Sequence, residues 1–78
     1  MQIKMFYRTQ RDLAAALNLI IDAYWNEEIL EKELIENVKE MHRTNQEKLI
    51  KNDEFTKVVQ QHCGKRRLSV VEKIIEMK

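Results

Sequence analysis

Hydrophobic residues recur at helical spacing over most of this chain. The first stripe consists of Leu13, Ala16, Leu17, Ile20 and Tyr24, and Ala14, Ile21 and Trp25 widen it. Residues three and four positions apart share one face of a helix, so this pattern predicts a helix from about residue 10 to 25. Thr9 and Asp12 have the spacing of a capping box at its start. Because the apolar face is broad, we expect this helix to be the central one.

A second helix is predicted over about residues 27–43. Asn26 is expected to end the first helix and to begin the second. Glu27 and Glu28 follow it, and negative charge at these positions stabilises a helix N-terminus. The apolar stripe of this segment consists of Leu30, Leu34, Val38 and Met41. His42 and Arg43 place positive charge at its C-terminal end, which suits the helix dipole.

Three further short helices are predicted over about residues 45–51, 53–63 and 66–77. Thr44 and Glu47 have the spacing of a second capping box, and Asn52 or Asp53 can cap the next helix. Gly64 is the single glycine of the chain. We expect it to adopt a left-handed backbone conformation and to end the helix before it.

The first residues follow a different period. Ile3, Met5 and Tyr7 alternate with mostly polar neighbours, which is the spacing of a strand. No other segment carries a strand pattern, so residues 1–8 are either an extended arm or a short strand that pairs with another copy. The expected fold is all-α: one domain over residues 1–78, a compact bundle of four to five short helices with an extended N-terminal arm.

Composition indicates the oligomeric state and the cellular compartment of the protein. The chain has 78 residues, of which 44% are hydrophobic and 35% charged, with one Gly and no Pro. A core of this size gives little net stability, which favours a homo-oligomer. One cysteine excludes an internal disulfide, and no apolar run is long enough for a membrane span. We therefore expect a cytoplasmic protein with no membrane association.

Positive charge is concentrated near the C-terminus, in "GKRRLS". A helix, a glycine and a second helix are the outline of a helix-turn-helix, and Lys57, Lys65, Arg66 and Arg67 would then contact nucleic acid. The last helix, however, has two apolar sides and carries Glu72 and Glu76, which do not suit a phosphate-facing surface. We therefore favour a joint at Gly64, with the cations solvated or paired with the acidic segment 27–40.

The apolar excess of the last helix indicates an interface. Its second apolar side consists of Val70, Ile74 and Met77. Trp25 lies at the edge of the first helical stripe, where an aromatic side chain can anchor a partner. These four residues are the predicted partner-binding set, although a purely structural role in the core remains the simpler interpretation of each.

No catalytic, cofactor-binding or metal-binding pattern is found. His62 and Cys63 are adjacent and point about 100° apart on a helix, so they do not easily share an ion. Glu36 and Glu40 share one face, but interspersed lysines favour a solvated face over a pair that acts as acid and base. We expect no enzyme activity; a subunit whose active site another chain completes is a weaker hypothesis.

Four segments carry a resemblance to a known family. These are "FYRTQRDLA", "IIDAYWN", "LIKNDEFTKVV" and "GKRRL", which together span most of the chain. The chain resembles a family of short, uncharacterised proteins from Firmicutes and their phages. The resemblance implies no ligand or functional residue, but it implies a small, intracellular protein associated with a phage or prophage. Small proteins of that kind often bind a host protein or a nucleic-acid machine.

The functional expectation is a non-enzymatic helical module that binds another protein, as a phage- or prophage-encoded inhibitor or regulator of a host factor. The alternative is a small DNA-binding regulator that uses the helix-turn-helix-like element at 53–77.

Overall fold

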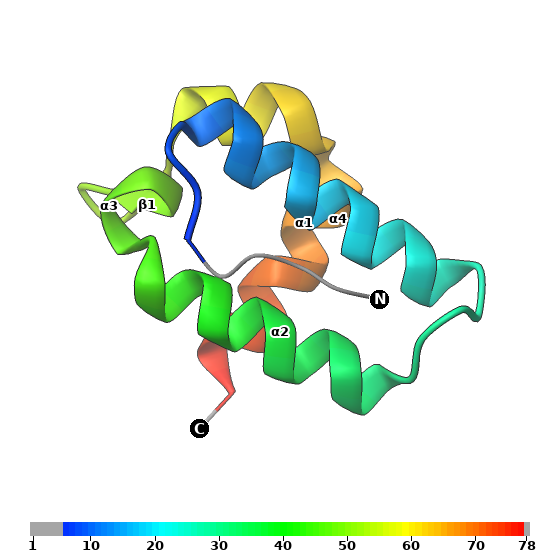
Figure 1. Cartoon of the computed structure of the whole chain (residues 1–78). Helices are drawn as coiled ribbons and strands as arrows, with labels where there is room; N and C mark the ends of the chain where they lie inside the picture. Colours follow the sequence, from blue (N-terminus) through cyan, green and yellow to red (C-terminus); the bar gives the residue numbers. More distant parts are fainter. Residues whose placement is uncertain (1–5, 78) are drawn as a thin grey trace.

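The computed structural model describes residues 6–77 of the chain (Figure 1). Its elements, in order, are α1 (Gln10–Trp25), α2 (Glu31–Thr44), α3 (Gln46–Leu49), β1 (Ile50–Lys51), β2 (Glu54–Phe55) and α4 (Lys57–Glu76). The expected all-α bundle is confirmed, with one small hairpin added to it. Residues 1–5 of the expected arm lie outside the described residues, and residues 6–8 belong to no helix or strand.

Helix α1 supplies the largest part of the hydrophobic core. Its buried residues are Leu13, Ala14, Ala16, Leu17, Ile20, Ile21 and Ala23, which is the broad face expected from the sequence. Helices α1 and α2 run in opposite directions, and α4 crosses behind both of them (Figure 1). The Thr9 hydroxyl accepts a hydrogen bond from the Asp12 amide at 3.0 Å, so Thr9 caps α1 as predicted.

Helix α2 begins four residues later than the sequence predicted. The amides of Asn26, Glu27 and Glu28 donate to the carbonyls at the end of α1, so they finish that helix rather than start the next. Glu27 has a left-handed backbone, with φ of 61°, which a helix cannot include. The segment 26–30 is therefore a connection, and Leu30 is the N-cap of α2.

A two-residue hairpin replaces part of the predicted helices 45–51 and 53–63. Asn52 and Asp53 have φ of 55° and 67°, the left-handed pair that a tight hairpin turn requires. Ile50 pairs with Phe55 across the hairpin. Asn52 and Asp53 therefore form a turn and do not cap a helix, and α4 begins after Thr56 instead.

The predicted capping box of Thr44 and Glu47 is also wrong. The Thr44 hydroxyl donates to the Glu40 carbonyl at 2.9 Å, within α2. Asn45 is the N-cap residue of α3, and its buried side chain donates to the Met41 carbonyl at 2.9 Å. Its Oδ1 accepts from the Tyr7 amide at 3.0 Å, so Asn45 ties Tyr7 to the end of α2.

Gly64 divides α4 into two helical parts that run in different directions (Figure 1). Its backbone has φ of 77° and ψ of 169°, which confirms the predicted left-handed glycine. The helix resumes at once after Gly64, so the joint is a single residue. This bend positions both surfaces considered below.

Candidate functional site

An apolar groove contains three of the four residues predicted to bind a partner. It has a volume of about 210 Å³ and lies between the C-terminal end of α1, the start of α2 and the end of α4. Its lining consists of Tyr24, Glu31, Leu34, Ile35, Val70, Lys73, Ile74 and Met77. We call this the α1–α2–α4 groove. Val70 and Ile74 are about one turn apart on α4, and Met77 directly follows this helix, so the end of α4 turns apolar side chains into the groove.

The predicted residues contribute to this groove in different ways. Met77 is the most exposed of the three, at 46%. Val70 is half-buried on the wall. Ile74 is only 3% exposed and belongs to the hydrophobic core, so it forms the floor. Trp25 does not line the groove; it follows Tyr24 at the end of α1 and is 39% exposed.

Trp25 is instead held by the basic segment that the nucleic-acid alternative uses. The guanidinium carbon of Arg66 lies 5.1 Å from the centre of the indole ring, and that of Arg67 lies 5.9 Å from it. Both distances fall within the range of a cation–π interaction. The structure therefore brings together residues that the sequence assigned to two competing functions.

Arg67 forms an ion pair with Asp22. Its Nε donates to Asp22 Oδ1 at 3.0 Å and its Nη2 donates to Asp22 Oδ2 at 2.9 Å, which is a two-point ion pair between α4 and α1. Its Nη1 also donates to the Cys63 carbonyl at 3.3 Å. The partner is thus α1 and not the acidic segment 27–40 that the sequence suggested. Sequence reasoning missed Asp22, although Asp22 lies one turn before Trp25 on α1.

The four predicted nucleic-acid residues have different surroundings. Lys57 opens α4 and lies in a depression with the hairpin turn, whereas Lys65 and Arg66 are exposed at the bend. The joint is one glycine, in contrast to the three- or four-residue turn of a helix-turn-helix. The exposed side of the second part of α4 carries Glu72 and Glu76.

The residues considered for metal or catalytic chemistry lie apart. Cys63 is buried, and burial raises the pKa of its thiol to about 11. Its Sγ contacts the Ala14 carbonyl at 3.7 Å, while His62 is exposed. Arg43 pairs with Glu40, and this hydrogen bond lowers the pKa of the Glu40 carboxyl. Within residues 6–77, no three His, Cys, Asp or Glu side chains are placed to hold a metal ion.

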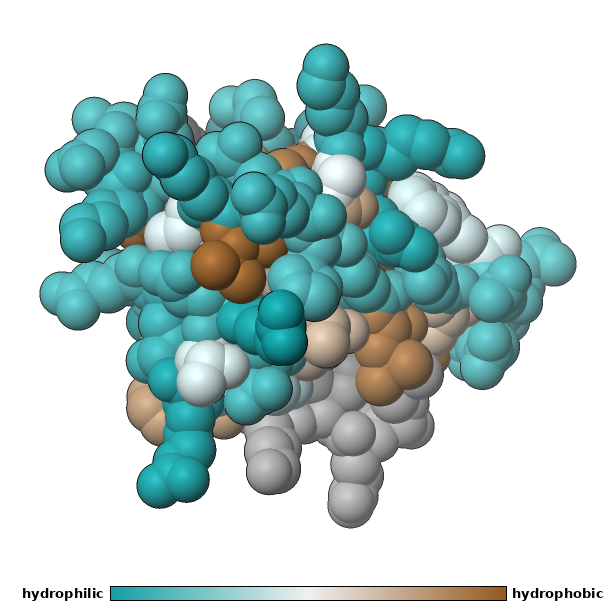
Figure 2. Space-filling model, turned by 90° about the horizontal axis from the view of Figure 1, so that it is seen from above, coloured by the Kyte–Doolittle hydropathy of each residue, from teal (hydrophilic) through white to brown (hydrophobic). Residues whose placement is uncertain are grey.

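The rest of the surface is largely hydrophilic where it is seen from above. In that view, hydrophobic side chains are separated by hydrophilic ones (Figure 2). No helix within residues 6–77 combines the length and the hydrophobicity that a membrane span requires.

Comparison with known proteins identifies a family and nothing further. Neither the curated proteins nor the solved structures yield a match. The family CLB_0814_fam, described as conserved hypothetical protein, matches residues 4–76, which is nearly the whole chain. The chain therefore belongs to the conserved hypothetical protein family CLB_0814_fam.

Proposed function

We propose that this protein is a non-enzymatic helical module that binds another protein through the α1–α2–α4 groove. The proposal places it in the cytoplasm of a Firmicute, encoded by a phage or prophage, as an inhibitor or regulator of a host factor. Its main support is the groove itself, in which most of the exposed lining is apolar. A monomer leaves such a surface in water at a cost in free energy that a partner removes.

The shape of the groove indicates how a partner would bind. Its volume of about 210 Å³ accommodates a large apolar side chain, and Met77 at the rim is an adaptable contact. Glu31 and Lys73 supply one charge of each sign at the edge, which orients a partner without selecting a strongly charged one. An apolar anchor of a partner helix fits this arrangement.

Self-association through the same groove is part of the proposal, because the domain is small and the exposed Met77 is close to the end of α4. Sedimentation velocity over a wide concentration range tests it. We expect Met77→Glu to shift the protein towards monomer, while Leu19→Glu does not. Leu19 is a matched control because it is 57% exposed and lies on α1 outside this groove. A wild-type protein that stays monomeric at high concentration removes the self-association part.

The alternative function, a DNA-binding regulator, has one observation in its favour. Lys65 and Arg66 are exposed at the bend, with Arg66 against Trp25, so cations and an aromatic ring lie together. Fluorescence anisotropy of labelled duplex DNA distinguishes the two functions. We expect no binding at physiological salt. Micromolar binding with a steep salt dependence, abolished by Lys65→Glu with Arg66→Glu, would replace our proposal with this alternative.

A further inference from the structure

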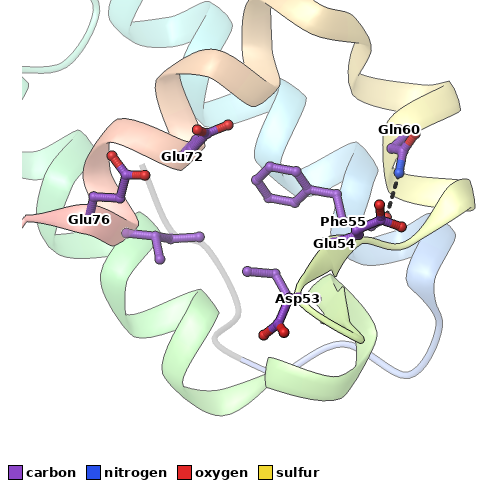
Figure 3. A pocket seen from close by; sticks show the side chains of 8 residues that line it. Asp53, Glu54, Phe55, Gln60, Glu72 and Glu76 are labelled. Atoms are coloured by element: carbon purple, nitrogen blue, oxygen red, sulfur yellow. Dashed lines mark hydrogen bonds between the residues drawn. The ribbon is translucent and has the colours of Figure 1, made fainter.

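A second groove lies on the inner side of the bend in α4. Two adjoining depressions of about 460 and 430 Å³ share four lining residues: Phe55, Gln60, Glu72 and Glu76. The hairpin forms one wall, and the second part of α4 forms the other (Figure 3). We call their union the acidic groove. Its lining shares only Lys73 with the α1–α2–α4 groove.

The floor of the acidic groove is apolar and fixed in place. It consists of Ile50, Phe55, Leu68 and Ile75, which are partly buried and pack against the hydrophobic core. The Gln60 side chain donates to the Phe55 carbonyl at 2.6 Å, which ties the first part of α4 to the hairpin. The Phe55 ring points from the hairpin towards the second part of α4 (Figure 3).

The rim is negatively charged. Asp53 and Glu54 stand on the hairpin, and Glu72 and Glu76 stand on α4 (Figure 3). All four are exposed, and none forms an ion pair with a residue of the part that the structure describes. The larger depression has no lysine or arginine in its lining, while Lys65 and Lys73 line the smaller one.

The placement of these carboxylates is unfavourable for the isolated protein. Glu72 and Glu76 are four residues apart on a helix, so they repel each other. Glu76 is also the last residue of α4, where the helix dipole disfavours negative charge. A cation in the groove removes both penalties.

We propose that the acidic groove binds a helical segment of a partner protein that carries arginine or lysine on one face and large apolar side chains on the other. The apolar side chains pack on Phe55 and its neighbours, and the basic side chains reach the rim carboxylates. The groove is open along its length, which suits a peptide segment better than an enclosed small molecule.

The probe is a fluorescein-labelled, 14-residue helical peptide with leucine on one face and arginine on the other. Fluorescence anisotropy is measured with the whole protein at low and physiological salt. We expect saturable binding that weakens as salt rises, because the rim charges contribute to it. A peptide with glutamate in place of arginine, and one with serine in place of leucine, should each bind at least about tenfold more weakly.

The matched variants separate the groove from the general charge of the protein. Glu72→Gln with Glu76→Gln removes two rim charges, and Glu33→Gln with Glu36→Gln removes two exposed charges on α2 outside either groove. The first pair should weaken binding about tenfold and the second should change it less than about twofold. Equal effects of the two pairs, or no saturable binding by wild type, would overturn the inference.

Two further arms complete the test. Spermidine that displaces the peptide at equal concentration would overturn the peptide assignment in favour of a small polyamine. Met77→Glu should leave peptide binding intact, because Met77 lines only the other groove. The proposals for the acidic groove and for the α1–α2–α4 groove are therefore tested by different variants.

Discussion

Gly64 bends α4 because it adopts backbone angles that other residues adopt only under strain. With φ of 77° and ψ of 169°, it lies in a region that L-amino acids with a side chain adopt only under strain. A Cβ built at Gly64 has no neighbouring atom within 4 Å, so space is not the constraint. The bend follows from backbone conformation alone, and it opens the acidic groove on its inner side.

Gly64→Ala should lower the free energy of unfolding by about 1–3 kcal/mol, the usual cost of a residue held in this region. Urea denaturation followed by circular dichroism measures it. D-Alanine at position 64, introduced by chemical synthesis, is the control because it favours positive φ. The D-alanine protein should match or exceed the stability of wild type. Equal stability of the two alanine proteins would show that backbone strain is not the cause.

Cys63 predicts a dependence of stability on pH. Burial raises the pKa of its thiol to about 11, so the unfolded chain loses this proton at a lower pH than the folded protein does. The thiol contributes no pH dependence at neutral pH. As pH rises above about 8.5, ionisation stabilises the unfolded chain and the free energy of unfolding falls.

Urea midpoints at pH 7 and pH 10 test this for wild type and Cys63→Ala. Other groups titrate in this range in both proteins, and the cost of the smaller side chain is common to both pH values. Stability should therefore fall more between pH 7 and pH 10 in wild type than in the variant. The same fall in both proteins would contradict a buried, protonated thiol.

At the scale of elements, one ion pair joins the end of α1 to α4 next to the bend. Asp22 and Arg67 make two hydrogen bonds, and Arg66 and Arg67 both lie over Trp25. The Arg67 side chain is 30% exposed and that of Asp22 is 41% exposed, so water screens the pair. Its contribution to stability is modest, but it holds the Arg67 guanidinium beside Trp25.

A double-mutant cycle with Asp22→Ala and Arg67→Ala should give a coupling energy of up to about 1 kcal/mol, as expected for an exposed pair with two-point geometry. The fluorescence of Trp25 should change in Arg67→Ala. Glu40→Ala, which removes the α2 pair with Arg43, is the control and should leave the emission unchanged. A coupling energy near zero would mean that the two side chains do not interact in solution.

The elements differ in how well the sequence predicts them. Helix α1 follows from its stripe and its Thr9 cap, which are local signals. The start of α2 could not be predicted in this way. The amides of residues 26–28 donate hydrogen bonds to the end of α1, and the spacing of apolar residues does not reveal these bonds. The hairpin was missed because two-residue strands are too short to show a period, although Asn52 and Asp53 are typical turn residues.

At the scale of the molecule, each groove is assembled from segments far apart in the sequence. Val70, Ile74 and Met77 were identified from their spacing, but their meeting with Tyr24 and Leu34 depends on how α4 crosses the other helices. The acidic rim depends on the hairpin and the bend together. The contact of Trp25 with Arg66 likewise joins α1 to α4 and was not predictable from either segment.

Site-specific photo-crosslinking in cells that express the protein tests whether the α1–α2–α4 groove binds another protein. Benzoylphenylalanine is placed at position 77 or, as the matched exposed control, at position 19. We expect an adduct of defined mass from position 77 only, which mass spectrometry identifies as one protein or a second copy, and which excess wild-type protein competes away. Equal adducts from both positions, or none that is specific to position 77, would contradict the account.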